Sequence, residues 1–157
     1  MKTELITSVH DALQGGGGNG ERYEYSARRL GQLLGLKKIG CNVFEVPPGK
    51  RAFPYHAHAE IEELFLVLEG EGTLRHDGAE HAIKAGDMIA APVGSAHQII
   101  NTSDAPIRYL AFSSGEKTDV VTYPDSGKVL AYTEGFGEPM FHITRQDDAV
   151  GYYEGEE

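Results

Sequence analysis

Short apolar segments separated by turn residues dominate the middle of the chain. No helical periodicity links them, and glycine, proline and aspartate lie between most of them. Many short strands with frequent turns are typical of an all-β sandwich or barrel. We therefore expect strands at Leu36–Val46, Leu64–Leu68, Gly72–Arg75, Glu80–Lys84, Met88–Ala91, His97–Asn101 and Ile107–Phe112.

The turns between these segments carry specific signals. Asp77-Gly78 lies between two strand-like runs and predicts a type I′ hairpin. Gly86 with Asp87 suits a tight connection, and Pro92-Val93-Gly94 suits a turn that ends one strand and begins the next. The sequence therefore predicts closely connected antiparallel strands.

We expect one domain in three parts, with residues 36–113 as the barrel core. Residues 1–35 are expected to form an N-terminal arm. Its segment 14–20 is rich in glycine and is predicted to be flexible, so that residues 1–20 form a mobile region. Residues 21–35 fit a short helix or an edge strand equally well. Residues 114–157 form a C-terminal extension, whose apolar runs at 120–121, 129–130 and 140–143 could add strands to the outside.

The candidate chemistry lies in two segments of the core. In a strand, residues i and i+2 point to the same face, so His56 and His58 can aim at one point. A turn after His58 could bring Glu63 to them from the next strand, and His97 would reach them across the barrel. Three neutral imidazoles with one carboxylate suit a transition metal better than Ca²⁺ or Mg²⁺.

Two acidic residues compete for the carboxylate position. Glu63 shares its strand face with Phe65 and Val67, whereas Glu62 points the opposite way in a regular strand. A β-bulge would reverse this assignment. We favour Glu63 and keep Glu62 as the alternative, with an exposed or interface role otherwise.

These segments resemble the paired motifs of the cupin superfamily. The first has His56-x-His58, then Glu63, then six residues to Gly70, and its leading Gly49 is displaced by one position. The second is complete and reads, in order, Gly86, Pro92, Gly94, His97 and Asn101. The resemblance spans about half the chain, from Pro47 to Phe112.

The resemblance implies a double-stranded β-helix, the cupin jelly-roll barrel. It also implies one divalent transition metal ion (Fe, Mn, Ni, Zn or Cu) held by His56, His58, Glu63 and His97, and it implies a homodimer. Gly70, Gly86, Pro92, Gly94 and Asn101 are then structural, with Asn101 hydrogen-bonding nearby backbone. Phe53 and Tyr55 precede the first histidines and are candidates to line the substrate pocket.

The strand that carries Glu63 also predicts a covering element. If Glu63 points into the barrel, then Leu64, Leu66 and Leu68 point outward and need cover. The N-terminal arm, the C-terminal extension or a second subunit could provide it.

Charge and composition exclude some partners. The net charge of −10 would repel a nucleic-acid backbone, so we expect no nucleic-acid binding. The longest apolar run, Leu64 to Leu68, is too short to span a membrane. The one cysteine, Cys41, excludes an intramolecular disulfide and, with no signal peptide visible, favours a cytoplasmic location.

Two functions follow from this sequence. The first is a metal-dependent enzyme of dioxygenase or isomerase type, in which open metal positions bind a small organic molecule through two oxygens. The alternative is a non-catalytic cupin that binds or senses a small molecule. The fold alone does not choose between them, because cupins host many chemistries.

Overall fold

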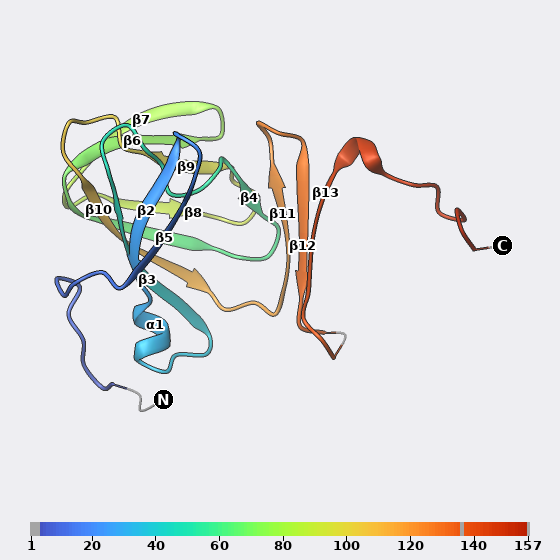
Figure 1. Cartoon of the computed structure of the whole chain (residues 1–157), viewed down its shortest axis with the longest axis horizontal. Helices are drawn as coiled ribbons and strands as arrows, with labels where there is room; N and C mark the ends of the chain where they lie inside the picture. The colour runs from blue at the N-terminus through green and yellow to red at the C-terminus, as the bar shows by residue number, and fades with distance from the viewer. Residues whose placement is uncertain (1–3, 136, 157) are drawn as a thin grey trace.

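A computed structural model describes residues 4–135 and 137–156, which form the elements labelled in Figure 1. The strands are β1 (Gly15–Asn19), β2 (Tyr23–Arg28), β3 (Ile39–Val46), β4 (Ala57–His58), β5 (Glu63–Glu69), β6 (Glu71–His76), β7 (Ala79–Lys84), β8 (Met88–Ala91), β9 (His97–Ile100), β10 (Ile107–Ser114), β11 (Thr118–Tyr123), β12 (Lys128–Thr133) and β13 (Met140–Arg145). The helices are α1 (Leu30–Leu33) and the 3₁₀ turn η1 (Gln146–Asp148). The predicted mobile arm includes residues 1–3, which lie outside the described residues.

Antiparallel strands form two facing layers (Figure 1). One layer is a six-stranded sheet in the order β1-β2-β3-β10-β5-β8. The other contains β7-β6-β9 and β13-β12-β11-β4, which meet through an isolated antiparallel bridge between His56 and His97. This is the double-stranded β-helix predicted from the sequence, and each predicted strand segment is recovered.

The core lies between the two layers. Alternate side chains of β5 point into it, so that Phe65 and Val67 are buried. Val46 and Ile107 contribute from β3 and β10, and Leu74 contributes from the opposite layer. The period-2 pattern therefore also directs Glu63, which has the same parity as Phe65, toward the barrel interior.

The N-terminal segment covers the opposite face of β5. Leu66 and Leu68 pack in a second apolar cluster with Val9 and Leu13. Arg108 of β10 holds this segment in place by donating a hydrogen bond of 2.7 Å to the carbonyl oxygen of Val9. The arm thus covers Leu66 and Leu68, two of the three outward leucines, as one of the three proposed alternatives stated.

The glycine-rich segment differs from its prediction. Gly15–Asn19 is not a flexible linker but forms β1, which pairs along its whole length with β2. Glycine allows this because a Cβ at Gly16 would collide with the backbone of Tyr25. Residues 21–35, for which helix and strand were both open, contain one of each, namely β2 and α1.

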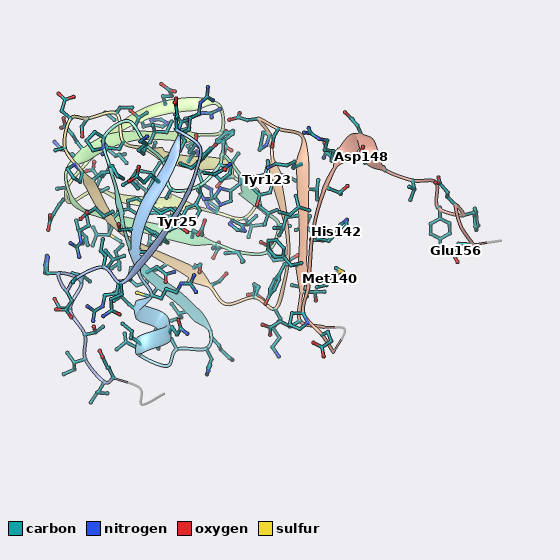
Figure 2. All side chains as sticks on the ribbon, viewed as in Figure 1. Tyr25, Tyr123, Met140, His142, Asp148 and Glu156 are labelled. Atoms are coloured by element: carbon teal, nitrogen blue, oxygen red, sulfur yellow. The ribbon has the colours of Figure 1, made fainter. Side chains whose placement is uncertain are left out.

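The C-terminal extension forms β11, β12 and β13, which stand beside the barrel (Figure 1). β11 pairs with β4, through Val121 with His58, so the extension borders the first histidine motif. All residues of β13 are exposed, and Met140 and His142 lie on this outer strand (Figure 2). None of the helices in the described part of the chain has the length and apolarity to cross a bilayer.

Left-handed turn residues fix the strand connections. Asp77 and Gly78 have φ angles of 46° and 83°, which confirms the predicted type I′ hairpin between β6 and β7. Gly70 has a φ of 79°, and an added Cβ would lie 2.5 Å from the carbonyl oxygen of Pro106. Gly70 is therefore required both by its dihedral angles and by the close approach of β10.

Asn101, which directly follows β9, forms side-chain hydrogen bonds with the end of β3 and with the loop before β10. Its side chain is 0% exposed, and its amide nitrogen donates hydrogen bonds of 2.8 Å to the carbonyl oxygens of Val46 and Ala105. Its amide oxygen accepts from the backbone and the hydroxyl of Ser103. Asn101 thus holds the loop before β10 against the end of β3.

We expect Asn101→Ala to lower the free energy of unfolding by about 2–4 kcal/mol, because buried carbonyl groups lose their donors and a cavity remains. Urea unfolding measures this change, with the exposed Asn19→Ala as the matched control. Equal stability of the two variants would contradict the structural role of Asn101.

Candidate metal centre

Three histidines converge on one carboxylate oxygen inside the barrel. The Nε2 atoms of His97, His58 and His56 lie 2.8, 3.4 and 3.9 Å from Oε2 of Glu63. His56 immediately precedes β4, His58 ends β4, and Glu63 and His97 begin β5 and β9. Ligand atoms of His56, Glu63 and His97 all lie within 4.8 Å of one another, a spacing that can hold a metal ion.

The backbone holds the two histidine motifs together. His56 and His97 form a pair of backbone hydrogen bonds of 3.2 and 2.8 Å across the bridge between their strands. The amide of Gly94 donates to the carbonyl oxygen of His58 at 2.8 Å, which ties the Pro92–Gly94 turn to β4. Segments about forty residues apart are therefore fixed relative to each other by main-chain bonds.

The second ring nitrogen of each histidine has its own acceptor. Nδ1 of His56 lies 2.8 Å from the carbonyl oxygen of Pro54, and Nδ1 of His97 lies 3.1 Å from that of Ser95. Nδ1 of His58 lies 2.6 Å from Oδ2 of Asp119. Because these partners accept only, each Nδ1 donates to its partner, which directs Nε2 of each ring toward Glu63.

Asp119 belongs to β11 and reaches the site from the C-terminal extension. Its side chain is 2% exposed. Besides His58, it accepts hydrogen bonds from the backbone amides of Ala59 and Glu60, at 3.1 and 3.0 Å. The carboxylate therefore orients the His58 ring and holds the chain that follows β4.

The environment shifts the pKa values of these groups. Burial, reinforced by the charge of His97, lowers the pKa of His56 to about 4. Burial acts to raise the pKa of Glu63, but hydrogen bonds with His58 and His97 outweigh it and lower the pKa to about 2. Burial acts to lower the pKa of His58, but Glu63 and Asp119 outweigh it and raise the pKa. Glu63 is thus ionised at neutral pH and His56 is neutral.

A cavity of about 290 Å³ opens beside this cluster. It is lined by Asn42, Phe44, Phe53, His56, His58, Glu63, Phe65, His97, Gln98, Ile99, Tyr109, Ala111, Phe112 and Ser113. This volume lies near the lower end of the range for small-molecule sites. Apolar side chains with a few converging polar groups give the composition expected of such a site.

The structure separates the two aromatic pocket candidates. Phe53 lines the cavity and is 38% exposed. Tyr55, in contrast, does not line it and requires a correction: its ring packs under the guanidinium of Arg75, 4.1 Å from ring centroid to Cζ, and its hydroxyl accepts a hydrogen bond from the amide of Gly78. Residues two positions apart, such as Phe53 and Tyr55, share a side in a regular strand. The segment that carries them is not a strand, so the two side chains point in different directions.

The alternative carboxylate lies away from the histidines. Glu62 is exposed, and its amide donates to the hydroxyl of Ser114 at 3.1 Å. The sequence reasoning did not single out Asp119 or Tyr109, both of which belong to the site. Neither lies in a motif, although the alternation of β10 would have pointed Tyr109 inward with Ile107.

The donor set fits a divalent transition metal. Three Nε2 atoms and one ionised carboxylate face a common point, and each imidazole has the acceptor at Nδ1 that metal-ligating histidines ordinarily have. Hard cations such as Ca²⁺ would require more oxygen ligands. Fold and site together define a β-barrel protein with a candidate metal centre at one wall of an internal cavity.

Comparison with known proteins gives the family. Residues 42–113 match the cupin domain family. With the fold and the related solved structures, this shows that the chain belongs to the cupin superfamily, as its motifs predicted. A crystal structure of a sugar phosphate isomerase of the cupin superfamily from Silicibacter pomeroyi superimposes with a TM-score of 0.77, at 28% identity, over 96% of both chains.

Curated relatives carry different names. Quercetin 2,3-dioxygenase of Bacillus subtilis is 29% identical over 129 residues, which cover 80% of this chain and 34% of the relative. The oxalate-binding protein of Thermotoga maritima is 34% identical over 67 residues, which cover 43% of this chain and 54% of the relative. The chain thus spans about a third and about half of the length of these two proteins.

The pKa of His56 predicts a pH dependence of the metal-free protein. Between pH 6.5 and about 4 the unfolded chain binds a proton on His56 that the folded state does not, so this residue lowers the free energy of unfolding as the pH falls. The contribution is about 3 kcal/mol at the acidic end. We expect His56→Gln to flatten this part of the pH profile.

Urea unfolding between pH 4 and 7, in the presence of a chelator, checks this prediction. The matched control is His81→Gln, which changes an exposed histidine on β7. If wild type and His56→Gln lost stability equally as the pH fell, the buried neutral state of His56 would be disproved.

Proposed function

We propose that this protein is a metal-dependent enzyme acting on a small organic molecule. In this proposal His56, His58, Glu63 and His97 bind one divalent transition metal ion, which is Fe, Mn, Ni, Zn or Cu. The observation that carries the proposal is the convergence of three Nε2 atoms and one carboxylate oxygen at the wall of a 290 Å³ cavity. A metal there would be both firmly held and accessible to a ligand.

The charge of the site fits substrate binding through oxygen. Three neutral imidazoles and one carboxylate leave a divalent ion with a net charge of about +1. When bound, the metal would supply Lewis-acid stabilisation to a substrate that coordinates through two oxygens. Phe44, Phe53 and Phe65 line the cavity with apolar rings, and the Tyr109 hydroxyl can donate a hydrogen bond to a bound oxygen.

The reaction is an oxidation by dioxygen or an isomerisation. The names of the quercetin 2,3-dioxygenase and the sugar phosphate isomerase support these two classes, which an oxygen-binding metal site can serve equally well. The metal that the protein selects would narrow the choice, because iron favours chemistry with dioxygen.

A non-catalytic binding protein is the second candidate. The relative named oxalate-binding protein favours it, since its name describes binding of a small oxygen-rich molecule. Incubation of the metal-loaded protein with a bound small molecule and dioxygen separates the two candidates. Recovery of that molecule unchanged would support the binding function, and turnover that stops on metal removal would support the enzyme.

The metal content of protein purified without a chelator or nickel resin tests the site directly. We expect about one transition metal ion per chain in the wild type, and loss of at least about 90% of it in Glu63→Ala and His97→Ala. His81→Ala is the matched control and should retain the metal. A wild type that stays metal-free after incubation with each of the five ions would refute the proposed site.

Asp119 should determine how tightly the metal is held. Asp119→Asn keeps the shape of the side chain but weakens its acceptor to Nδ1 of His58, so we expect the metal affinity to fall about 10- to 100-fold. Competition with a chromogenic chelator measures the dissociation constant. The matched control is Asp125→Asn, which alters an exposed partner of Arg75 at 2.7 Å. Equal affinities in both variants would contradict a role for Asp119 in positioning His58.

We also propose that the chain forms a homodimer. Exposed apolar side chains on β13, including Phe141 and Ile143, support this because a solitary edge strand seldom presents them to water. Sedimentation velocity should give twice the mass of one chain, and Ile143→Glu should shift the protein toward the monomer. A wild type that remains monomeric at high concentration would exclude the dimer.

A further inference from the structure

A continuous row of aromatic rings runs along the cavity to the metal centre. Phe53 contacts Phe44 with 5.2 Å between ring centroids, Phe44 contacts Tyr109 at 5.6 Å, and Tyr109 contacts Phe65 at 6.1 Å. Phe65 then contacts the ring of His97 at 5.6 Å. All these side chains line the cavity, so a molecule bound beside His97 would lie against aromatic faces and edges.

The same cavity offers no cationic side chain to a phosphate. Among residues 4–135 and 137–156, those that line it include no lysine or arginine. Arg28 and Arg29 line an adjoining depression that shares Asn42, Phe44 and Phe53 with the cavity. The Arg28 guanidinium is already paired with Asp11 at 3.0 Å, and Arg29 is exposed.

A buried hydroxyl is available to a ligand oxygen. Tyr109 is 2% exposed and lines the cavity beside Phe65. Burial, together with the charge of Glu63, raises the pKa of Tyr109 above its usual range. The hydroxyl therefore stays protonated and can donate. Gln98, in contrast, is occupied by the carbonyl oxygen of Phe53 and by Arg75.

Charge balance favours a ligand with one negative charge at most. A metal with Glu63 as its only anionic ligand has a net charge of about +1, which a singly ionised vicinal diol neutralises. A phosphate dianion at the metal would instead leave a net negative charge in the cavity, whose lining has no lysine or arginine to balance it.

We infer that the cavity binds a small aromatic molecule with two adjacent oxygen atoms, of the catechol type, rather than a phosphorylated sugar. The ring would lie along Phe53, Phe44 and Phe65, and the oxygens would face the histidine–glutamate cluster and the Tyr109 hydroxyl. This inference rests on the proposed function, because the metal centre receives the oxygens. The proposed ligand class differs from the one in the name of the solved relative that superimposes over 96% of the chain, a sugar phosphate isomerase.

The test compares two probes on the same metal-loaded protein. 4-Nitrocatechol is followed by its absorbance change and by calorimetry, and fructose 6-phosphate is followed by calorimetry. We expect 4-nitrocatechol to bind at least about tenfold more tightly, because only its ring matches the aromatic wall. Tighter binding of fructose 6-phosphate, or equal binding, would overturn the inference.

Two variants locate the probe. Phe53→Ala should weaken 4-nitrocatechol binding about tenfold, and Tyr109→Phe, which removes only the hydroxyl, should weaken it about fivefold. The matched control Phe141→Ala removes a ring that is 68% exposed on β13, outside the cavity, and should change affinity by less than about twofold. Unchanged affinity in both cavity variants would place the probe elsewhere and refute the inference.

Metal content, measured on each sample, separates this inference from the proposed function. If metal binds and 4-nitrocatechol does not, the substrate class is wrong and the metal centre stands. If no metal binds, the metal-dependent function fails. The aromatic wall is then tested on the metal-free protein with the same probes and variants, and a lack of preference for 4-nitrocatechol there also refutes the inference.

Discussion

The arrangement of three imidazoles around one carboxylate is the constraint on which this molecule's other features depend. The side chain of Glu63 is 17% exposed and is ionised, and a largely buried charge is tolerated only where hydrogen-bonding partners surround it. Its partners come from β4 and β9, so the two sheets that contain these strands must meet where His56 bridges His97. Each imidazole is held from behind through Nδ1, which leaves Nε2 directed at Glu63. The contacts that close the barrel therefore also fix the geometry of the site.

The outer elements of the chain are also tied to this site. β11 lies beyond the segment that carries the cupin motifs, yet its Asp119 holds the ring of His58 and the amides that follow it. At the other end, Val9 and Leu13 pack in one apolar cluster with Leu66 and Leu68 of β5, the strand that begins with Glu63. The extension and the arm thus stabilise the two strands on which the first motif depends.

The interior combines a polar cluster with an aromatic wall. Phe65 has the same parity on β5 as Glu63 and contacts the His97 ring, so the strand that supplies the carboxylate also supplies the first ring of the wall. Low polarity beside the cluster strengthens electrostatic interactions with any bound oxygen. The ligand preference proposed above follows from this combination, because rings surround the position at which charge is concentrated.

The barrel, most strand positions, the Asp77-Gly78 hairpin and the inward direction of Glu63 on β5 could be predicted from the sequence. These features follow from alternation and turn chemistry, which are local properties of the chain. Three other features became known from the folded structure: Gly15–Asn19 pairs as a strand, Tyr55 turns away from the cavity, and Asp119 hydrogen-bonds His58. Strand pairing and contacts between residues about sixty positions apart depend on which surfaces meet after folding. A local sequence pattern does not contain this information.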